Sequence, residues 1–156
     1  MHFSLFIDIG GTSLTEEDKQ TLLHPVISGV ILFTRNFQNI AQLKQLIEEI
    51  RSLKDPRLLV SVDQEGGNVQ RFRHSFTKLP SFSKIGEIHQ INPNLGKKIA
   101  AEHACIMVEE LRSIGVDLSF TPVVDIGNKN SKVLKDRTFS ENPNIVAELA
   151  LLYTQT

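Results

Sequence analysis

The chain has 156 residues, of which 40% are hydrophobic and 22% are charged, and its formal net charge is −1. That length is enough for one domain with a hydrophobic core, and the composition is ordinary for a soluble globular protein. The balanced charge, without a basic stripe, argues against nucleic acid as a partner. Cys105 is the only cysteine, which excludes an intramolecular disulfide framework.

No segment predicts a membrane anchor or a secretion signal. A helix that spans a bilayer needs about 20 consecutive apolar residues, and the chain has no such stretch. Residues 1–9 are apolar, but they lack a basic segment and include Asp8, which is unlike a signal peptide. We therefore expect a cytoplasmic protein that does not bind membranes.

The first half of the chain predicts two strands, each followed by a helix. Residues 3–9 and 29–33 are short apolar runs of the kind that form strands. Residues 16–23 follow Thr15, a favourable N-cap, and predict a short helix. Residues 40–53 carry apolar side chains at helical spacing, which predicts a longer amphipathic helix.

The second half predicts two further strand–helix pairs. Residues 58–62 and 116–124 are the next apolar runs and are expected to be strands. Residues 93–114 form the longest helical pattern, and they begin with a proline, which is favoured at the first helical position. A last helix is expected from Asn142-Pro143 to the end of the chain.

The order of these elements predicts an α/β fold. The four apolar runs are nearly continuous, which is typical of strands buried on both faces of a parallel sheet. Repeated βα units form either a doubly wound sheet or a (β/α)8 barrel. A full barrel takes about 250 residues, so four units in 156 residues correspond to half a barrel. The chain also stops inside an amphipathic helix, an unusual end for a natural domain.

The segment after the third predicted strand is the richest in functional groups. Asp63 and Glu65 are two residues apart and would point to the same side of an extended chain. Gly66 and Gly67 follow, where the backbone can turn sharply, and then Arg71. Three interpretations remain open: an acid/base pair for glycoside hydrolysis, a carboxylate that binds sugar hydroxyls, or a strand-end carboxylate that only holds its loop.

Other predicted strand ends also carry polar groups, which favours a pocket at the carboxyl edge of the sheet. Arg71 and Arg137 lie in loops and are candidate clamps for a ligand, whereas Arg73 fits a solvated side chain. The candidate pocket-lining residues are Asp8, Arg35, Glu65 and Asp125.

The sequence predicts neither a metal site nor a cofactor. The histidines share no ligand spacing, and His103, within the long predicted helix, fits a partly buried packing residue. The five histidines are His2, His24, His74, His89 and His103. Gly10-Gly11 is not followed by a dinucleotide-binding fingerprint, and there is no Walker-type loop.

Three segments resemble glycoside hydrolase family 3, and within it the bacterial β-N-acetylhexosaminidases of peptidoglycan recycling. They are residues 29–36 (Gly-Val-Ile-Leu-Phe-Thr-Arg-Asn), 62–72 (Val-Asp-Gln-Glu-Gly-Gly-Asn-Val-Gln-Arg-Phe) and 120–125 (Phe-Thr-Pro-Val-Val-Asp). The similarity extends along essentially the whole chain, and the middle segment is the most specific.

The resemblance implies a TIM barrel whose sugar site includes three residues of this chain. Asp63 would bind sugar hydroxyls, and Arg71 would help to shape that site. Arg137, in the loop Asp-Arg-Thr-Phe at residues 136–139, would contact the sugar. On this reading the catalytic interpretation of Asp63 and Glu65 loses ground.

The family's catalytic motifs do not occur in residues 1–156. In the family, a Lys-His-Phe-Pro-Gly-His-Gly loop carries the acid/base histidine, which an aspartate orients, and a Ser-Asp-Asp-Leu-type motif supplies the aspartate nucleophile of a retaining mechanism. We therefore assign no catalytic residue to this chain. We expect residues 1–156 to be the N-terminal part of a single family 3 barrel domain, inactive by itself.

The leading hypothesis is the substrate-binding half of a β-N-acetylhexosaminidase that releases N-acetylglucosamine from muropeptides. The alternative is a non-catalytic half-barrel that binds sugar or self-assembles, because the two unpaired edges of its sheet would seek partners. Expected partners are an N-acetylglucosamine-containing sugar or muropeptide, a second copy, or a missing C-terminal half. A β-glucosidase activity is a third hypothesis, which the Gln-Glu-Gly-Gly motif disfavours.

Overall fold

The computed structural model describes residues 4–128 and 130–156 and divides the chain into two compact units. We call them the sheet unit and the helical unit. The sheet unit consists of Met1–Asp63, Arg71–Phe76 and Glu110–Ser119. The helical unit consists of Gln64–Gln70, Thr77–Glu109 and Phe120–Thr156. No helix in the described part of the chain is long and apolar enough to cross a membrane.

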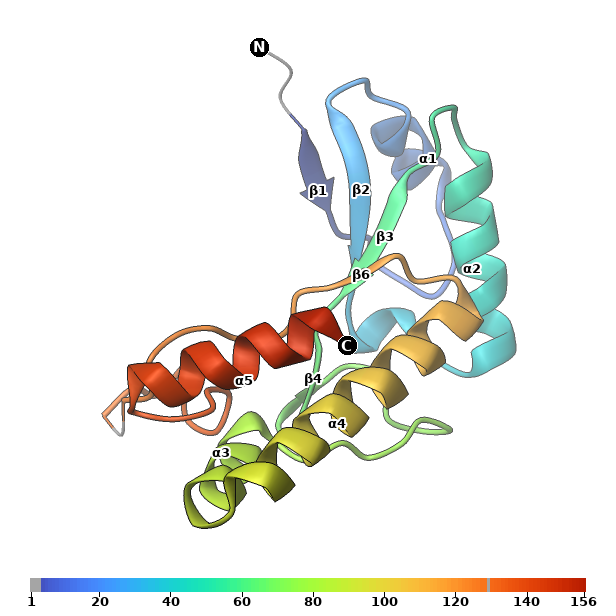
Figure 1. Cartoon of the computed structure of the whole chain (residues 1–156). Helices are drawn as coiled ribbons and strands as arrows, with labels where there is room; N and C mark the ends of the chain where they lie inside the picture. The colour runs from blue at the N-terminus through green and yellow to red at the C-terminus, as the bar shows by residue number, and fades with distance from the viewer. Residues whose placement is uncertain (1–3, 129) are drawn as a thin grey trace. The chain divides into compact units, whose positions relative to one another are not determined.

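The sheet unit is built on a parallel four-stranded sheet in the order β1-β2-β3-β6 (Figure 1). Its strands are β1 (Leu5–Ile7), β2 (Ile27–Leu32), β3 (Leu59–Val62) and β6 (Leu118–Ser119). α1 (Glu16–Leu22) connects β1 to β2, and the 3-10 turn η1 (Thr34–Asn36) and α2 (Ile40–Ser52) connect β2 to β3. This arrangement confirms the predicted parallel α/β class. The predicted first strand began at Phe3, which lies outside the described residues.

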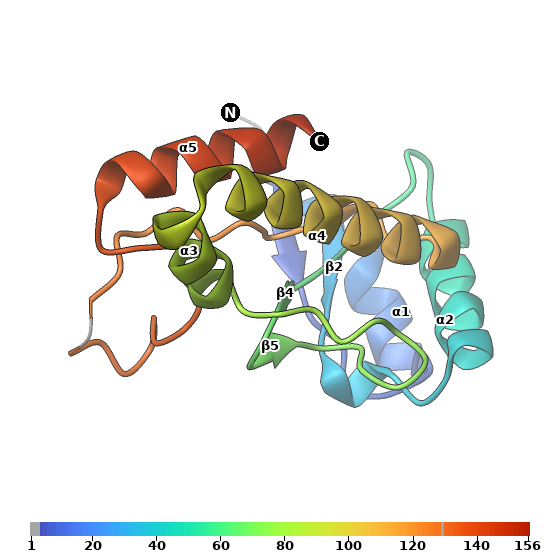
Figure 2. The same ribbon diagram turned by 60° about the horizontal axis from the view of Figure 1, so that its bottom comes forward.

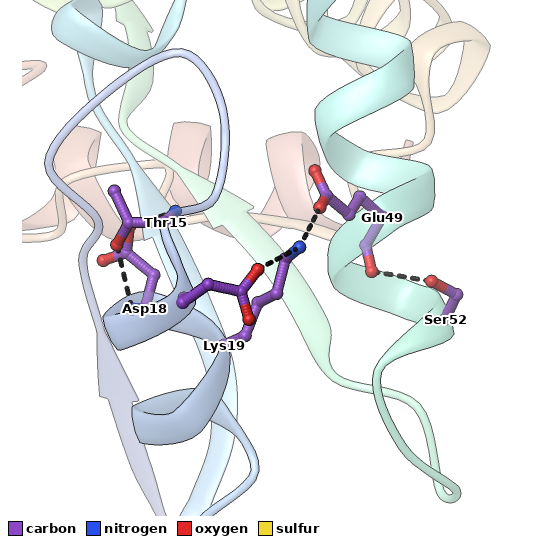
Figure 3. Close-up of polar contacts among 6 residues, drawn as sticks. Thr15, Asp18, Lys19, Glu49 and Ser52 are labelled. Carbon is purple, nitrogen blue, oxygen red and sulfur yellow. Dashed lines mark hydrogen bonds and ion pairs between the residues drawn. The ribbon is translucent and has the colours of Figure 1, made fainter.

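The predicted helices of this unit form where the sequence placed them, because their N-termini are capped. The Thr15 hydroxyl accepts a hydrogen bond from the Asp18 amide at 3.1 Å, and the Asp18 carboxylate accepts from the Thr15 amide at 2.9 Å (Figure 3). In α2, the Asn39 side chain accepts from the Gln42 amide at 2.9 Å.

Two features of the sheet differ from the prediction. Only Leu118–Ser119 of the predicted strand at residues 116–124 is a strand. Pro122 has no N–H to donate to a ladder, and Val124 is 65% exposed, so the apolar pattern there does not reflect burial in the sheet. Leu59 and Leu118 are each 42% exposed, but Ser61, on the same face of β3 as Leu59, is fully buried, so the predicted burial of both faces holds only in part. The opposite face, with Val60 and Val62, is fully buried.

Asp117 joins several segments of the sheet unit at the start of β6. Its carboxylate accepts hydrogen bonds from Arg51 at 2.7 Å, from Arg57 at 2.9 and 3.0 Å, and from the Val60 amide at 2.9 Å. Burial alone would raise the pKa of Asp117, but the hydrogen bonds from Arg57 and Val60 and the two arginine charges outweigh it and lower that pKa.

An Asp117→Asn substitution is therefore expected to destabilise the protein at neutral pH and to matter less in acid. A carboxyl group with a lowered pKa contributes stability above its unfolded-state pKa of about 4, and that contribution is lost as the pH falls through the folded-state pKa. Urea denaturation of both proteins at neutral pH and near pH 3 checks this. A difference in unfolding free energy that stays constant across that range would contradict it.

The helical unit contains a short antiparallel hairpin and three helices (Figure 2). The hairpin is β4 (Gln64–Gly66) with β5 (Val69–Gln70), and the helices are α3 (Phe82–Ile91), α4 (Pro93–Ile114) and α5 (Pro143–Gln155). Residues of α4 up to Glu109 belong to this unit. The structure confirms both predicted helices, α4 and α5. The sequence reading missed the hairpin and α3.

Candidate functional site

The ends of β1, β2 and β3 bring charged residues together in the sheet unit. Asp63 directly follows β3, and Arg71 Nη2 donates to its Oδ2 at 2.9 Å. Arg35 likewise donates from Nη2 to the Asp8 carboxylate and from Nε to the Ile9 carbonyl at 3.1 Å. Four predicted residues thus form two ion pairs at the carboxyl edge of the sheet.

Phe33 connects these two pairs. The Arg35 guanidinium carbon lies 4.7 Å from the centre of the Phe33 ring, and that of Arg71 lies 5.2 Å from it. Both distances suit attraction between a cation and an aromatic ring. Phe33 directly follows β2, so the sheet itself fixes its position. The apolar run at residues 29–33 contained this residue, but nothing in the pattern indicated its contact with two arginines.

In the helical unit, Arg137 forms a two-pronged ion pair with Glu65. Arg137 Nε donates to Glu65 Oε2 at 2.9 Å, and Nη2 donates to Oε1 at 2.7 Å. The Glu65 side chain is 3% exposed and that of Arg137 is 29% exposed. This parallel geometry fixes the plane of the guanidinium as well as its position. Glu65 therefore fixes the orientation of the Arg137 guanidinium.

A second contact joins the same two segments and was not predicted. Asn68 Nδ2 lies 3.1 Å from both carboxylate oxygens of Asp136. Gly67 has φ +55°, and a Cβ atom there would lie 2.6 Å from Ser81 Cβ and 3.1 Å from Asp136 Oδ2. The hairpin turn thus fits closely against the loop that carries Arg137. Gly-Gly-Asn after a strand was the available signal, because this composition favours a tight hairpin turn.

Asp125, the remaining predicted pocket residue, is exposed. Within residues 4–128 and 130–156 it makes no hydrogen bond or ion pair, so the structure does not join it to the Glu65–Arg137 pair. The helical unit also has an open cavity of about 370 Å³, lined in part by Ser83, Glu87 and Lys135. None of the predicted site residues lines it, so its size does not identify it as the site.

The described residues contain no group of three or more His, Cys, Asp or Glu side chains that could hold a metal ion. His103 is buried between two hydrogen-bond partners, the Tyr153 hydroxyl at 2.9 Å from Nδ1 and the Pro80 carbonyl at 3.1 Å from Nε2. Burial lowers the pKa of His103, and the Pro80 hydrogen bond opposes this only in part. A neutral imidazole with both nitrogens bonded is a structural element here.

Parallel βα units with charged residues at their carboxyl ends are the first part of a (β/α)8 barrel, the fold predicted from the sequence. The chain belongs to glycoside hydrolase family 3, since the model of the "Glycosyl hydrolase family 3 N terminal domain" matches residues 6–156.

Among curated relatives, a β-hexosaminidase of Nitrosomonas eutropha is 49% identical over 146 residues, which are 94% of this chain and 42% of the relative. A β-hexosaminidase of Neisseria meningitidis serogroup C is 50% identical over 145 residues, 92% of this chain and 40% of the relative. The chain thus spans about two fifths of the length of these relatives.

Solved structures give the same result. Native NagZ of Neisseria gonorrhoeae is 46% identical, with a TM-score of 0.92 over 95% of this chain and 44% of that one. NagZ of Neisseria gonorrhoeae in complex with N-trifluoroacetyl-D-glucosamine gives 45% identity and a TM-score of 0.93, over 97% and 45% of the two chains. A family 3 β-N-acetylglucosaminidase of Paenibacillus is 26% identical, with a TM-score of 0.87 over 99% of this chain and 29% of that one.

Proposed function

We propose that this chain supplies the sugar-binding residues of a β-N-acetylhexosaminidase. The enzyme would release terminal N-acetylglucosamine from muropeptides during peptidoglycan recycling in the cytoplasm. The curated relatives named β-hexosaminidase support the activity, and the NagZ complex with an N-acylated glucosamine supports the class of ligand. The muropeptide substrate is proposed from the sequence resemblance, and the cytoplasmic location is the expectation drawn from the sequence itself.

The observation that carries this proposal is the pairing of each predicted sugar-binding arginine with a carboxylate. In our assignment, Arg71 holds Asp63, whose second oxygen accepts hydrogen bonds from sugar hydroxyls. Glu65 orients Arg137, which donates to the sugar. Carboxylate oxygens and planar guanidinium donors together match the alternating donors and acceptors of a sugar ring.

We further propose that the isolated chain binds sugar without hydrolysing it. A retaining glycosidase needs one carboxylate free to attack and one group free to donate a proton. Here Glu65 has both oxygens bonded to Arg137, and one Asp63 oxygen is bonded to Arg71. These pairs suit ground-state binding and orientation of a substrate. They leave neither residue suited to transfer protons.

An Asp63→Asn substitution tests the assignment. We expect it to weaken N-acetylglucosamine binding about tenfold or more, because hydrogen bonds to a charged group contribute about 1.5–3 kcal/mol. Binding would be measured by NMR titration of the whole chain with N-acetylglucosamine. Asp55→Asn, which removes the same charge at an exposed position, should bind like the unmodified chain. Equal affinity of all three proteins would contradict the assignment.

A chromogenic N-acetyl-β-glucosaminide, added to the same samples, tests the second part of the proposal. We expect no turnover above the background of the Asp63→Asn protein. Turnover by the unmodified chain that survives repurification and disappears with Asp63→Asn would place the chemistry within residues 1–156 and overturn this part.

The alternative is a half-barrel that pairs with a second copy of itself. The exposed Leu59 and Leu118 favour it, as does the position of β1 and β6 at the edges of their sheet. Light scattering separates the two candidates, because self-pairing requires a compact dimer whose formation does not depend on sugar.

A further inference from the structure

We propose that His103, a buried residue of α4, is a positioning residue for the sugar site. It would act by holding the Pro80 carbonyl against the Gly66 turn, which sets the place of Glu65 and thereby the orientation of Arg137. This inference rests on the proposed function, because it takes Arg137 to contact the sugar. All of these residues belong to the helical unit.

The turn at Gly66, next to Glu65, lies in contact with Pro80 and His103. Gly66 has φ +85°, in the region that favours glycine. A Cβ atom at Gly66 would lie 2.4 Å from the Pro80 carbonyl oxygen, 2.9 Å from His103 Nε2 and 3.0 Å from Leu79 Cβ. The Pro80 carbonyl and the imidazole therefore pack directly against the peptide that follows Glu65. A shift of either would move the end of β4.

The hydrogen bonds of His103 define a single tautomer. The Pro80 carbonyl can only accept, so the proton of the neutral ring lies on Nε2, 3.1 Å from that oxygen. Nδ1 must then accept from the Tyr153 hydroxyl, at 2.9 Å. Burial lowers the pKa of His103 and so favours this neutral form. The ring consequently donates in one direction only, toward Pro80.

Aromatic rings connect His103 to the other side of the ion pair. The Phe82 ring lies 5.4 Å from the His103 ring and 4.7 Å from the Phe139 ring. Phe139 is two residues beyond Arg137 and is fully buried. His103 therefore lies directly against the turn after Glu65, and the Phe82 ring connects it to Phe139 in the loop after Arg137. No polar group of His103 is left to serve another purpose.

Two amide substitutions of His103 test whether its hydrogen bond to the Pro80 carbonyl is what matters, because they place a side-chain nitrogen either near that carbonyl or away from it. In His103→Gln, the side-chain nitrogen lies as many bonds from the backbone as Nε2 and can still donate to Pro80. In His103→Asn, the nitrogen is one bond shorter and lies where Nδ1 does, away from Pro80. Tyr153→Phe removes the hydroxyl that donates to Nδ1 and keeps the aromatic ring. Gln and Phe nearly fill the space of the side chains that they replace, whereas Asn is smaller, and circular dichroism would establish that each variant folds.

The measurements are the affinity for N-acetylglucosamine and the NMR signal of the Arg137 Nε–H, which reports the Glu65 pair directly. We expect His103→Asn to weaken binding about fivefold, the worth of one hydrogen bond, and to shift the Arg137 signal. His103→Gln and Tyr153→Phe should bind within about twofold of the unmodified chain and keep the signal in place.

Two results would overturn the proposal. One is an Arg137 signal that is unchanged in folded His103→Asn. The other is a loss of sugar affinity in His103→Gln or Tyr153→Phe that equals the loss in His103→Asn, which would indicate a general packing role. If His103→Asn does not fold, His103→Gln becomes the test, and a changed Arg137 signal in that variant would overturn the proposal. If the unmodified chain does not bind the sugar, the proposed function fails, but the Arg137 signal still tests the positioning.

Discussion

Replacing Arg137 with alanine is expected to lower the free energy of unfolding by about 3–5 kcal/mol, because a buried carboxylate would lose its partner. The Glu65 side chain is only 3% exposed, and both of its oxygens accept from Arg137. Removing Arg137 therefore takes both charged donors from this carboxylate. Urea denaturation at neutral pH measures the loss.

Two controls define what this loss means. Arg112→Ala removes an exposed arginine and should change stability by no more than about 0.5 kcal/mol. The double variant Glu65→Leu with Arg137→Met removes both charges while roughly keeping volume, and it should recover much of the stability. An Arg137→Ala protein as stable as Arg112→Ala would show that the ion pair does not stabilise the helical unit.

The second large effect is expected at Gly86, in the middle of α3. In an exposed helix, a change from glycine to alanine stabilises by about 1 kcal/mol. Here a Cβ atom would lie 1.6 Å from the Phe139 carbonyl oxygen and 2.7 Å from its carbon. Because backbone atoms cannot rotate away, Gly86→Ala is expected to destabilise by about 3 kcal/mol or more. Thermal unfolding measures the change.

Gly10→Ala is the matched control, since nothing lies within 4 Å of a Cβ atom there. It should leave the melting temperature nearly unchanged. A Gly86→Ala protein that melts at or above the temperature of the unmodified chain would mean that α3 does not pack against the Phe139 backbone as described.

The same glycine explains why α3 was not predicted. Gly86 lowers the helical propensity of a short segment, and its structural reason, the Phe139 backbone, lies more than 50 residues further along the chain. The hairpin of β4 and β5 was missed because its buried side chains include Gln64, Glu65 and Gln70, which resemble a polar loop. Apolar periodicity detects only elements whose buried face is apolar.

Elements with a strong local signal were predicted well. Thr15 caps α1 where the sequence indicated, and Pro93 begins α4. The strand at residues 116–124 was predicted too long because local hydrophobicity does not reveal a missing ladder partner. At Pro122 the backbone has no donor to offer.

The sequence named the residues of the candidate site but not the partners that they have in the structure. Strand ends indicated Asp8, Arg35 and Asp63, and the loop position indicated Arg71 and Arg137. No local pattern showed that Glu65 would bind an arginine 72 residues away. The spacing of Asp63 and Glu65 suggested one carboxylate pair, whereas the structure bonds each to a different arginine. Their roles toward a sugar stay predictions.

The most direct test of this account is an NMR titration of the whole, isotopically labelled chain with N-acetylglucosamine, with glucose as the comparison ligand. We predict that backbone signals shift around Asp63 and Arg71, along the hairpin, and around Arg137, and that glucose shifts them less. A chain that does not respond to N-acetylglucosamine, or that responds only around the cavity lined by Ser83 and Glu87, would contradict the assignment of these residues to a sugar site.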